Sequence, residues 1–530
     1  VSPISVKSPI HRLVSARCCA MDYLHGHPFS LAATAAALLV GVYFLSAFRA
    51  RKKRKGRCAP AAGTVFHQLL NFNSIHDYHT DLARRFKCFR LLAPGMSYVY
   101  LVDPPDVEYI LRTNFANYGK ESYIHNNFKD LLGDGIFAVD GDEWRRQRKL
   151  ASFEFSTRNL RDYSSNTFRR NALRLALVIS EAAGSGRTVD IQDLFMKSTL
   201  DSIFKVGFGV ELDTLLGSSE EEIRFSKAFD DSSELILWRF ADVFWKIKRA
   251  LNIGSEAALK KHIKVVDGFV YKHINRKIEQ MSGPQDDSVK KEDLLSRFLV
   301  EGEKDGSKMS NKYLRDIILN FIIAGRDTTA GTLSWFFYML CKHQDVQEKV
   351  AREVNEATKA GYGITMEEFV GNLTEEALDK MQYLHAALTE TLRLYPAVPE
   401  DPRMCQSDDT LPSGFDVKEG DMVSYLPYSM GRLKDLWGED VEDFHPERWL
   451  DETGIFRPES PFKFTAFQAG PRICLGKEFA YRQMKISSAV LIHFFVFRMS
   501  DEKDVRYRSM MTLQIYQGLH LRASPRQTKN

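Results

Sequence analysis

The sequence predicts a mainly α-helical protein with small β-sheets, behind an N-terminal transmembrane helix. Apolar residues recur at helical spacing over most of residues 126–343, which is typical of a helical domain. Alternating apolar residues are confined to short segments, such as "FRLLAPGMSYVYLVDPPDV" and the stretch after Pro396, which predict small sheets. Residues 29–48 contain no charged side chain and are long enough to cross a bilayer.

Composition favours one large domain behind this anchor. The 530 residues show no internal repeat and no long linker rich in Pro, Gly or Ser. Hydrophobic residues make up 44% of the chain and charged residues 27%, as in ordinary globular proteins. Seven basic residues between positions 49 and 57 contribute more positive charge than the net charge of +4, so the rest of the chain is slightly negative. The rest of the chain offers no basic field, so we expect no nucleic-acid partner.

The N-terminal region predicts the location of the protein. A basic stretch directly after an apolar span places the following chain in the cytosol, most naturally at the endoplasmic reticulum membrane. A cleaved signal peptide would have a shorter apolar run. The first twenty residues are basic and lack Asp and Glu, so a plastid transit peptide stays an alternative. The scattered cysteines, seven in number and without a CxxC pair, indicate a reducing compartment rather than disulfides or a zinc site.

These features divide the chain into four segments. Residues 1–28 form an N-terminal segment that we expect to be partly non-native, because Val1 is no ordinary initiator and Met21 would start a compact anchor. Residues 29–48 are the transmembrane anchor, and residues 49–70 are a basic stop-transfer stretch and hinge. An irregular connector is expected over residues 57–75. Residues 71–530 form the large domain.

Three helices of this domain can be placed from their end signals. Ser310 is a suitable N-cap for a helix that runs to about Lys342 and is apolar nearly all round in its middle, so it should be central and buried. Asp379 is expected to cap a second helix, which presents a stripe of leucines and ends before Pro396. A final helix is expected over residues 473–497.

The most specific motif is the cysteine loop "FQAGPRICLG". A lone buried cysteine such as Cys474 is usually inert packing. Here Gly470 and Gly476 allow the backbone to approach a ligand closely, while Phe467 can lie against a flat cofactor and Arg472 can meet an anionic group. The start of the following helix supplies donors and positive potential, which keep a thiolate deprotonated. The loop therefore favours a ligating thiolate.

A second motif, "AGRDTT", lies in the middle of the predicted buried helix. Gly, Asp and Thr are poorer helix formers than Ala, so a plain kink is the alternative interpretation. In a functional interpretation, Gly325 leaves room for a diatomic ligand, and Thr328 bonds back to a carbonyl and opens the helix locally. Asp327 can then relay protons.

Two further groupings of charged residues are less specific. Glu390 and Arg393 lie three residues apart and share a helix face. Such a pair is usually a solvated surface contact, but this helix is otherwise apolar. Trp144 and Arg148 lie four residues apart in "WRRQR", which alone indicates an exposed basic helix.

The cysteine loop fits the pattern Phe-x-x-Gly-x-Arg-x-Cys-x-Gly at every position and resembles the haem-binding loop of the cytochrome P450 family. The four motifs occur in the order of that family over residues 71–521. The resemblance implies a cytochrome P450 fold that binds haem b (iron protoporphyrin IX), with Cys474 as the metal ligand. The haem-binding residues would be Trp144, Arg148, Arg403, Phe467, Arg472, Cys474 and Gly476.

The same resemblance implies roles for the other motifs. Asp327 and Thr328 would be the catalytic acid and alcohol that take part in oxygen activation. "FHPERW" adds a partner to the charged pair, and Trp449 in it replaces the usual Phe, a conservative departure. The structural triad would be Glu390, Arg393 and Arg448. A positive surface for an acidic electron donor would be formed by Arg145, Arg146, Lys149 and Lys477.

The substrate prediction also rests on resemblance. Stretches such as "NYGK" and "LLGDGIFAVDGDEWRRQRKLASFEFS" are similar to plant long-chain fatty-acid ω-hydroxylases that make spore- and pollen-wall precursors. This implies a monomeric monooxygenase that uses O2 and two electrons from NADPH, delivered by a separate NADPH–cytochrome P450 reductase. A long apolar channel with one cation near its mouth would hold the lipid. The residues expected above the haem are Phe321, Val398 and Met511.

Three alternatives stay open. The first is a P450 monooxygenase that acts on terpenoids or sterols. The second is a P450-fold isomerase or dehydratase of fatty-acid hydroperoxides, although such proteins typically lose the acid–alcohol pair or alter the cysteine loop. The third is a non-catalytic haem-binding protein, which would have no reason to keep Asp327 and Thr328.

Overall fold

The computed structural model describes residue 41 and residues 57–93, 96–155, 158–281, 293–296, 299, 310–361, 363–501 and 504–526. Apart from Gly41, the predicted anchor at residues 29–48 lies outside the described residues, and so does most of the basic stretch after it. Among the helices that the structure does describe, none combines the length and the apolar character that a bilayer crossing requires.

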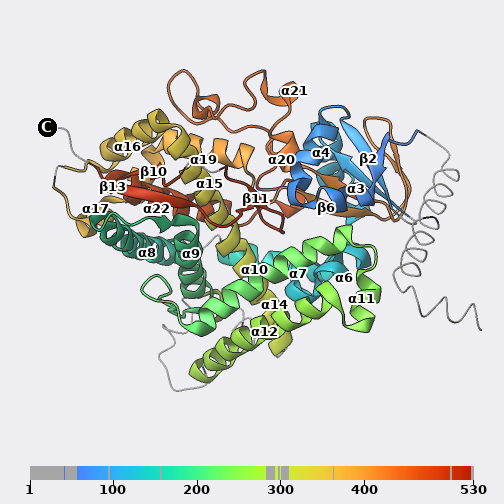
Figure 1. Cartoon of the computed structure of the whole chain (residues 1–530), viewed down its shortest axis with the longest axis horizontal. Helices are drawn as coiled ribbons and strands as arrows, with labels where there is room; N and C mark the ends of the chain where they lie inside the picture. Colours follow the sequence, from blue (N-terminus) through green and yellow to red (C-terminus); the bar gives the residue numbers. More distant parts are fainter. Residues whose placement is uncertain are drawn as a thin grey trace, which may run out of the picture.

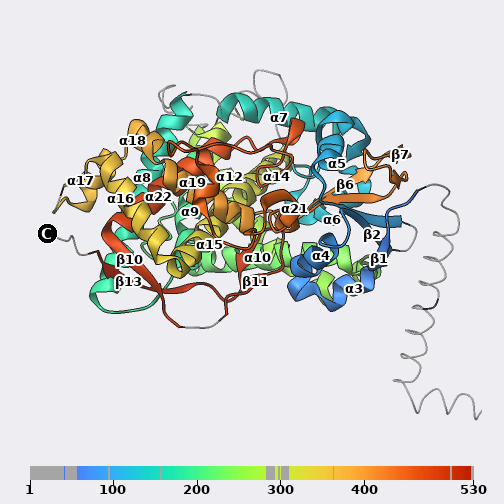
Figure 2. The ribbon, with the colours of Figure 1, turned by 90° about the horizontal axis from the view of Figure 1, so that it is seen from above.

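Helices make up most of the described chain, as predicted. In chain order they are α3 Val65–Leu70, α4 Ile75–Ala83, α5 Pro104–Glu108, α6 Glu121–Leu132, α7 Gly141–Phe155, α8 Arg158–Gly184, α9 Ile191–Phe208, α10 Glu220–Ala241, α11 Trp245–Leu251, α12 Gly254–Met281, α14 Asn311–Ile322, α15 Thr328–Lys342, α16 Gln344–Thr358, α17 Met366–Asn372, α18 Glu375–Lys380, α19 Gln382–Leu394, α20 Pro427–Met430, α21 Lys434–Trp437 and α22 Lys477–Phe494. In Figures 1 and 2, α15 lies in the middle of the molecule, between the helices α8, α9 and α22 and the end that carries β2 and β6.

The strands are short and form small sheets. They are β1 Ala61–Thr64, β2 Cys88–Ala93, β3 Met96–Leu101, β4 Tyr118–Gly119, β5 Val189–Asp190, β6 Asp401–Cys405, β7 Asp409–Thr410, β8 Asp416–Val417, β9 Met422–Tyr425, β10 Phe495–Met499, β11 Tyr507–Arg508, β12 Gln514–Ile515 and β13 His520–Pro525. The largest sheet has the order β1-β2-β3-β9-β6-β4 and lies at one end of the molecule (Figure 1). Strands β2 and β3 form the antiparallel pair that the alternating pattern predicts.

The irregular connector predicted for residues 57–75 is wrong. Residues 61–64 form β1, which pairs in parallel with β2, and residues 65–70 form α3. The backbone N–H of Arg90 donates to the Pro60 carbonyl at 2.9 Å, and Val65 is fully buried. Because these contacts join residues far apart in the sequence, local patterning did not reveal them. The sheet therefore begins before residue 71.

The central buried helix is confirmed, with one interruption. Ser310 caps α14, since its hydroxyl accepts a hydrogen bond from the Tyr313 backbone N–H at 3.1 Å. A π-helical turn at Ile323–Asp327 separates α14 from α15. The second motif of the sequence lies on this turn, as π-turns at functional sites often do.

The predicted starts of two later helices are wrong. Asp379 lies inside α18, and α19 begins at Gln382. The carboxylate of Glu353, in α16, instead accepts from the backbone N–H groups of Tyr383 (2.6 Å) and Leu384 (2.8 Å), so a distant residue caps this helix. The final helix α22 starts at Lys477 rather than at residue 473, because the cysteine loop forms only a short 3-10 turn at Gly470–Arg472 and then leaves the helical conformation at Ile473. Residues 495–499 form β10, which pairs with β13.

Candidate active site

A cavity in the protein interior is bordered by both the cysteine loop and the π-helical turn. We call it the cysteine cavity. The residues at its wall come from α7, α9, α14, the π-turn, α15, the segment after α19 and the loop before α22, and they include Phe321, Ala324, Thr328, Val398 and Cys474. The structure thus brings the two central motifs to one site, together with two of the three residues predicted above the haem.

The cysteine loop holds Cys474 with its thiol toward this cavity. The Cys474 backbone N–H donates to the Phe467 carbonyl at 2.8 Å, which closes the loop. Gly470 has φ +64°, and a Cβ there would lie 2.0 Å from the Leu111 carbonyl oxygen, so only glycine fits. Burial raises the pKa of the Cys474 thiol, while the Gly476 backbone N–H and the Arg148 and Lys477 cations lower it.

Four cations gather beside the cysteine cavity. Arg472 forms an ion pair with Asp140 at 2.6 Å and stacks over the Trp144 ring at 4.6 Å. Asp401 forms 2.7 Å ion pairs with both Arg403 and Lys120. The fourth cation is Arg148, which lines the cavity. Asp140 and Asp401 therefore pair with three of the four cations, which are Lys120, Arg148, Arg403 and Arg472.

This surplus of positive charge fits the two propionates of haem. Burial lowers the pKa of Arg472 to about 10, and nearby Arg403 contributes to that shift. The Nε atoms of Arg403 and Arg472 are buried without a hydrogen-bond partner among the described residues. Buried cations of this kind favour bound carboxylates. The cavity residues thus fit haem in charge, in the available donors and in the thiolate they present.

Sequence reasoning missed Lys120 as a member of this group. It is buried, and burial lowers the pKa of its amine to about 7, with Arg403 adding to the effect and Asp401 opposing it. A lysine that follows Asn117, Tyr118 and Gly119 gives no local sign of burial, because its carboxylate partner lies 281 residues further along the chain.

The π-helical turn arises from side-chain bonds to the helix backbone. The Thr328 hydroxyl donates to the Ala324 carbonyl at 2.5 Å, as predicted, and the Thr199 hydroxyl of α9 donates to the Arg326 carbonyl at 3.1 Å. Gly325 lines the cysteine cavity, where the sequence predicts room for a ligand. Packing gives a second reason for glycine, because a Cβ at this residue would lie 2.7 Å from Cδ1 of Ile203 in α9, whose side chain would have to shift.

Asp327 is fully buried behind this turn. Its Oδ1 accepts from Arg326 Nη1 at 2.7 Å, and the same nitrogen donates to Asp230 of α10 at 2.7 Å. Oδ2 has no hydrogen-bond partner among the described residues. Burial raises the pKa of Asp327 to about 7, and Asp230 adds to this, whereas Arg326 lowers it. Arg326 and Asp230 line a polar cavity between α9 and α10, and Arg326 connects Asp327 to it by hydrogen bonds.

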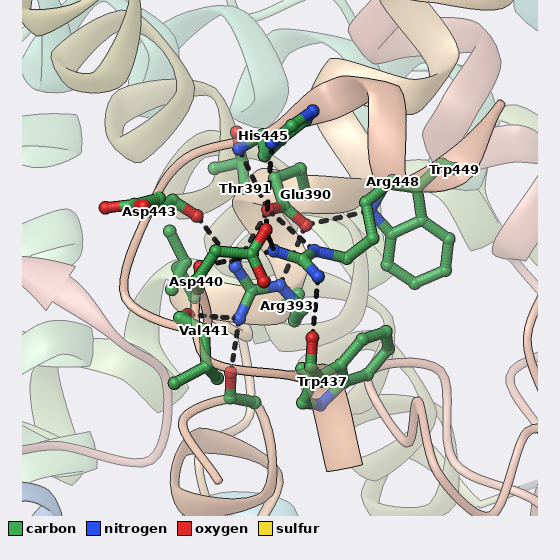
Figure 3. Close-up of polar contacts among 12 residues, drawn as sticks. Glu390, Thr391, Arg393, Trp437, Asp440, Val441, Asp443, His445, Arg448 and Trp449 are labelled. Atoms are coloured by element: carbon green, nitrogen blue, oxygen red, sulfur yellow. Dashed lines mark hydrogen bonds and ion pairs between the residues drawn. The ribbon is translucent and has the colours of Figure 1, made fainter. Parts of the chain in front are cut away.

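The predicted structural triad is present (Figure 3). Glu390 is fully buried and accepts from Arg393 through both oxygens, at 2.7 and 2.8 Å. Arg448 Nε approaches the same carboxylate at 3.4 Å. Arg393 also donates to the carbonyls of Val441 (2.7 Å) and Asp443 (3.0 Å). The triad therefore ties α19 to the segment that precedes the cysteine loop.

Trp449 contributes more to the triad than the sequence suggested. Its indole Nε1 donates to Glu390 Oε2 at 2.8 Å, a bond that the usual Phe cannot make (Figure 3). The indole is also fully buried and packs against Phe464, with ring centroids 4.9 Å apart. The replacement is therefore a gain of one charge-assisted hydrogen bond rather than a neutral exchange.

We expect Trp449→Phe to lower the free energy of unfolding by about 1.5–3 kcal/mol, because it leaves a buried carboxylate short of one donor. Thermal unfolding and the fraction of protein that retains haem measure the effect. Trp335→Phe is the matched control, since the Trp335 indole is also buried but donates to the neutral Leu513 carbonyl at 3.0 Å. Its loss should be about 0.5–1.5 kcal/mol. Equal losses in both variants would show that the Glu390 bond adds nothing special.

A further cavity, distinct from the polar one near Arg326, adjoins the cysteine cavity. It is mainly apolar, and we call it the apolar cavity. The two share wall residues, among them Ala324, Thr328 and Val398. Met511, the third residue predicted near the substrate, lines the apolar cavity. The Lys and Arg residues that line it in the described chain are Lys120, Arg148, Arg403 and Arg472. All four belong to the cation group described above, so the described wall shows no separate cation of the kind expected near the mouth.

The predicted positive surface for an electron donor is partly neutralised. Arg145 pairs with Asp142 at 2.6 Å, and Arg146 pairs with Glu143 at 2.8 Å. Both pairs are exposed, so each contributes little to stability but cancels charge locally. Lys149 and Lys477 remain from the predicted set, and steering of an acidic partner would rest mainly on them.

Comparisons with known proteins identify the family of the chain. The family profile described as "Cytochrome P450" matches residues 58–524. "Cytochrome P450 704C1" of Pinus taeda is 50% identical over 505 residues, which cover 93% of this chain and 97% of the relative. "Cytochrome P450 704B1" of Arabidopsis thaliana is 44% identical over 524 residues, covering 94% of this chain and all (100%) of the relative. "Cytochrome P450 94A2" of Vicia sativa is 39% identical over 439 residues, or 80% and 82% of the two chains.

A mainly helical fold and a cavity lined by the cysteine of such a loop are the features expected of proteins that bind haem through a cysteine. The chain belongs to the cytochrome P450 family and is a cytochrome P450 monooxygenase. Its relatives named above come from plants. Family membership implies haem, and the charge, the free donors and the cysteine of the cysteine cavity fit that cofactor.

Proposed function

We propose that this monooxygenase ω-hydroxylates long-chain fatty acids at the cytosolic face of the endoplasmic reticulum membrane. The observation that carries the proposal is the apolar cavity, which adjoins the cysteine cavity and can place an alkyl chain next to Thr328 and Val398. Residues 29–48 would anchor the protein, and NADPH–cytochrome P450 reductase would supply the electrons. The protein would act as a monomer.

In this proposal haem would bind in the cysteine cavity, and Cys474 would be the residue that ligates its iron. When bound, haem supplies the oxygen chemistry of the reaction. Phe467 and Gly476 flank the thiolate on the cysteine loop, and the backbone N–H of Gly476 stabilises its charge. The haem propionates would be held by the four cations and by the indole N–H of Trp144 in α7. This haem-binding set is Trp144, Arg148, Arg403, Phe467, Arg472, Cys474 and Gly476, with Lys120 added by the structure.

The acid and the alcohol divide the proton transfer between them. Asp327 takes protons from the polar cavity lined by Arg326, because its pKa is raised to about 7 and both of its protonation states are populated near neutral pH. The Thr328 hydroxyl lines the cysteine cavity and stands next to Asp327 in the chain. Its bond to the Ala324 carbonyl fixes it at the π-turn, where it can pass a proton into the cavity.

The test uses the full-length protein with haem bound. A thiolate-type carbon-monoxide difference band, and a low- to high-spin shift of the Soret band on adding C12 to C18 fatty acids, are the expected results. Product analysis with the reductase present should then find ω-hydroxy acids. A normal carbon-monoxide band without any response to fatty acids, but with a response to terpenoids or sterols, would overturn the substrate assignment. The retained Asp327 and Thr328 favour the monooxygenase over an isomerase or a non-catalytic role.

A further inference from the structure

One carboxyl group in the wall of the apolar cavity lacks a basic partner. Asp401 and Glu400 are neighbours in the chain, and both line this cavity. Asp401 is neutralised by Arg403 and Lys120 at 2.7 Å each. Glu400 forms no ion pair with any Lys or Arg of the described chain, and its one ion-pair contact is with His79, where Nδ1 lies 3.5 Å from Oε2. Glu400 is thus the exception in this wall.

His79 does not neutralise Glu400. The imidazole is fully buried, and burial lowers its pKa to about 3, so the ring carries no charge near neutral pH. Burial also raises the pKa of Glu400 to about 7, with Asp401 adding to the shift and the Ser424 hydroxyl opposing it. The Glu400 carboxyl therefore lines the apolar cavity beside an uncharged imidazole and has no Lys or Arg of the described chain as an ion-pair partner.

Polar side chains from three other elements surround this carboxyl. The side-chain amide nitrogen of Gln68, in α3, donates to the Tyr100 hydroxyl of β3. The same nitrogen lies 3.3 Å from His79 Nε2. The rings of His79 and Tyr100 are 4.6 Å apart. Gln68, Tyr100 and Glu400 all reach the cavity wall, with His79 behind them. A buried polar cluster of this kind is costly unless a ligand or water completes its hydrogen bonds.

The cluster determines which substrate group it can accept. A carboxylate repels the anionic head of a fatty acid but accepts a strong hydrogen bond from a neutral hydroxyl. Glu400 lies two residues after Val398, which lines the cysteine cavity, and two residues span at most about 7 Å. A long-chain lipid with its terminal carbon in the cysteine cavity therefore passes Glu400 part-way along its chain. The group that meets Glu400 is a substituent on the chain and not its head.

We propose that Glu400, backed by His79, Gln68 and Tyr100, is a hydrogen-bond acceptor site that selects lipids carrying a hydroxyl group part-way along the alkyl chain. The inference rests on the proposed function, because it assumes a long-chain lipid whose end enters the cysteine cavity. It narrows that function to hydroxylated long-chain substrates.

The experiment measures Soret spin-shift dissociation constants in the haem-loaded full chain at about pH 8.5, above the pKa of Glu400, so that its carboxyl is charged. Octadecanoic acid is compared with a series of hydroxyoctadecanoic acids whose hydroxyl moves along the chain. One isomer, or two adjacent ones, should bind at least about 10-fold more tightly than octadecanoic acid, because a hydrogen bond to a charged group has this effect. Glu400→Leu should abolish the preference. The isosteric Glu400→Gln, which keeps an acceptor without the charge, should retain part of it.

Met422→Leu is the control, because it alters the same cavity wall without adding or removing a hydrogen-bonding group. It should keep the preference for the hydroxylated isomer. If octadecanoic acid shifts the spin state but no isomer binds more tightly, or if Glu400→Leu keeps the preference, the acceptor site is overturned while the proposed function stands. If no fatty acid of the series shifts the spin state, both fail together.

Discussion

Replacing Cys474 by serine is expected to remove the thiolate-type carbon-monoxide band and to lower turnover by more than about 100-fold. Residues that merely support a metal ligand already change metal affinity or activity by 10- to 100-fold, so loss of the ligand itself should cost more. The Cys474 thiol is held toward the cavity by the bond from its own N–H to the Phe467 carbonyl, and two nearby cations favour its charged form. A serine hydroxyl stays protonated there and provides no comparable charge. Difference spectra and product formation under identical haem loading give the result.

The control for this variant is Cys58→Ser. Cys58 is a free cysteine next to β1, at the edge of the largest sheet, and it does not line the cysteine cavity. Its replacement should leave the band and the turnover within about twofold, as surface substitutions usually do. A Cys474→Ser protein that kept the thiolate-type band would show that another residue ligates the iron, and the assignment of the cysteine loop would fall.

Features with local signals were the ones that the sequence could predict. The Ser310 cap could be predicted because its hydroxyl bonds the backbone N–H only three residues later, so the signal is local. The β2–β3 pair follows from alternating residues on either side of the Pro-Gly pair in the sequence. The cap of α19 could not be predicted, since it comes from Glu353 in another helix. The same holds for β1, whose partner strand lies more than twenty residues later.

The site divides in the same way. Motif spacing located Cys474, Asp327 and Thr328, because their chemistry is carried by residues a few positions apart. Lys120 and Glu400 were not identified from the sequence. Their shifted pKa values come from burial in the cavity wall, and burial depends on the whole fold. The role of Trp449 was underestimated for a related reason. An indole N–H matters only when an acceptor faces it, and that acceptor lies 59 residues earlier.

The pKa of Asp327 has a direct consequence for the pH dependence of turnover. Burial and the nearby Asp230 carboxylate raise this pKa to about 7, against the lowering effect of Arg326. Protonated Asp327 is the form that can donate. As the pH rises through about 7 the residue loses this proton, and the turnover of the native protein should fall along a limb centred near that pH. The reductase must be present in excess so that electron supply does not hide the limb.

Asp327→Asn is expected to lower turnover by about 100-fold, the usual contribution of a positioned general acid, and to remove this limb. Haem loading and the Soret response to substrate should stay unchanged, because Asp327 touches neither cavity wall near Cys474. Asp230→Asn is the paired variant. It takes away the like charge that raises the pKa of Asp327 while Arg326 stays bonded to Asp327, so the limb should move to lower pH with a smaller loss of turnover. If Asp327→Asn kept the native turnover and the same limb, protons would have to reach the cavity by a route that avoids Asp327, and the role given to the π-helical turn would be wrong.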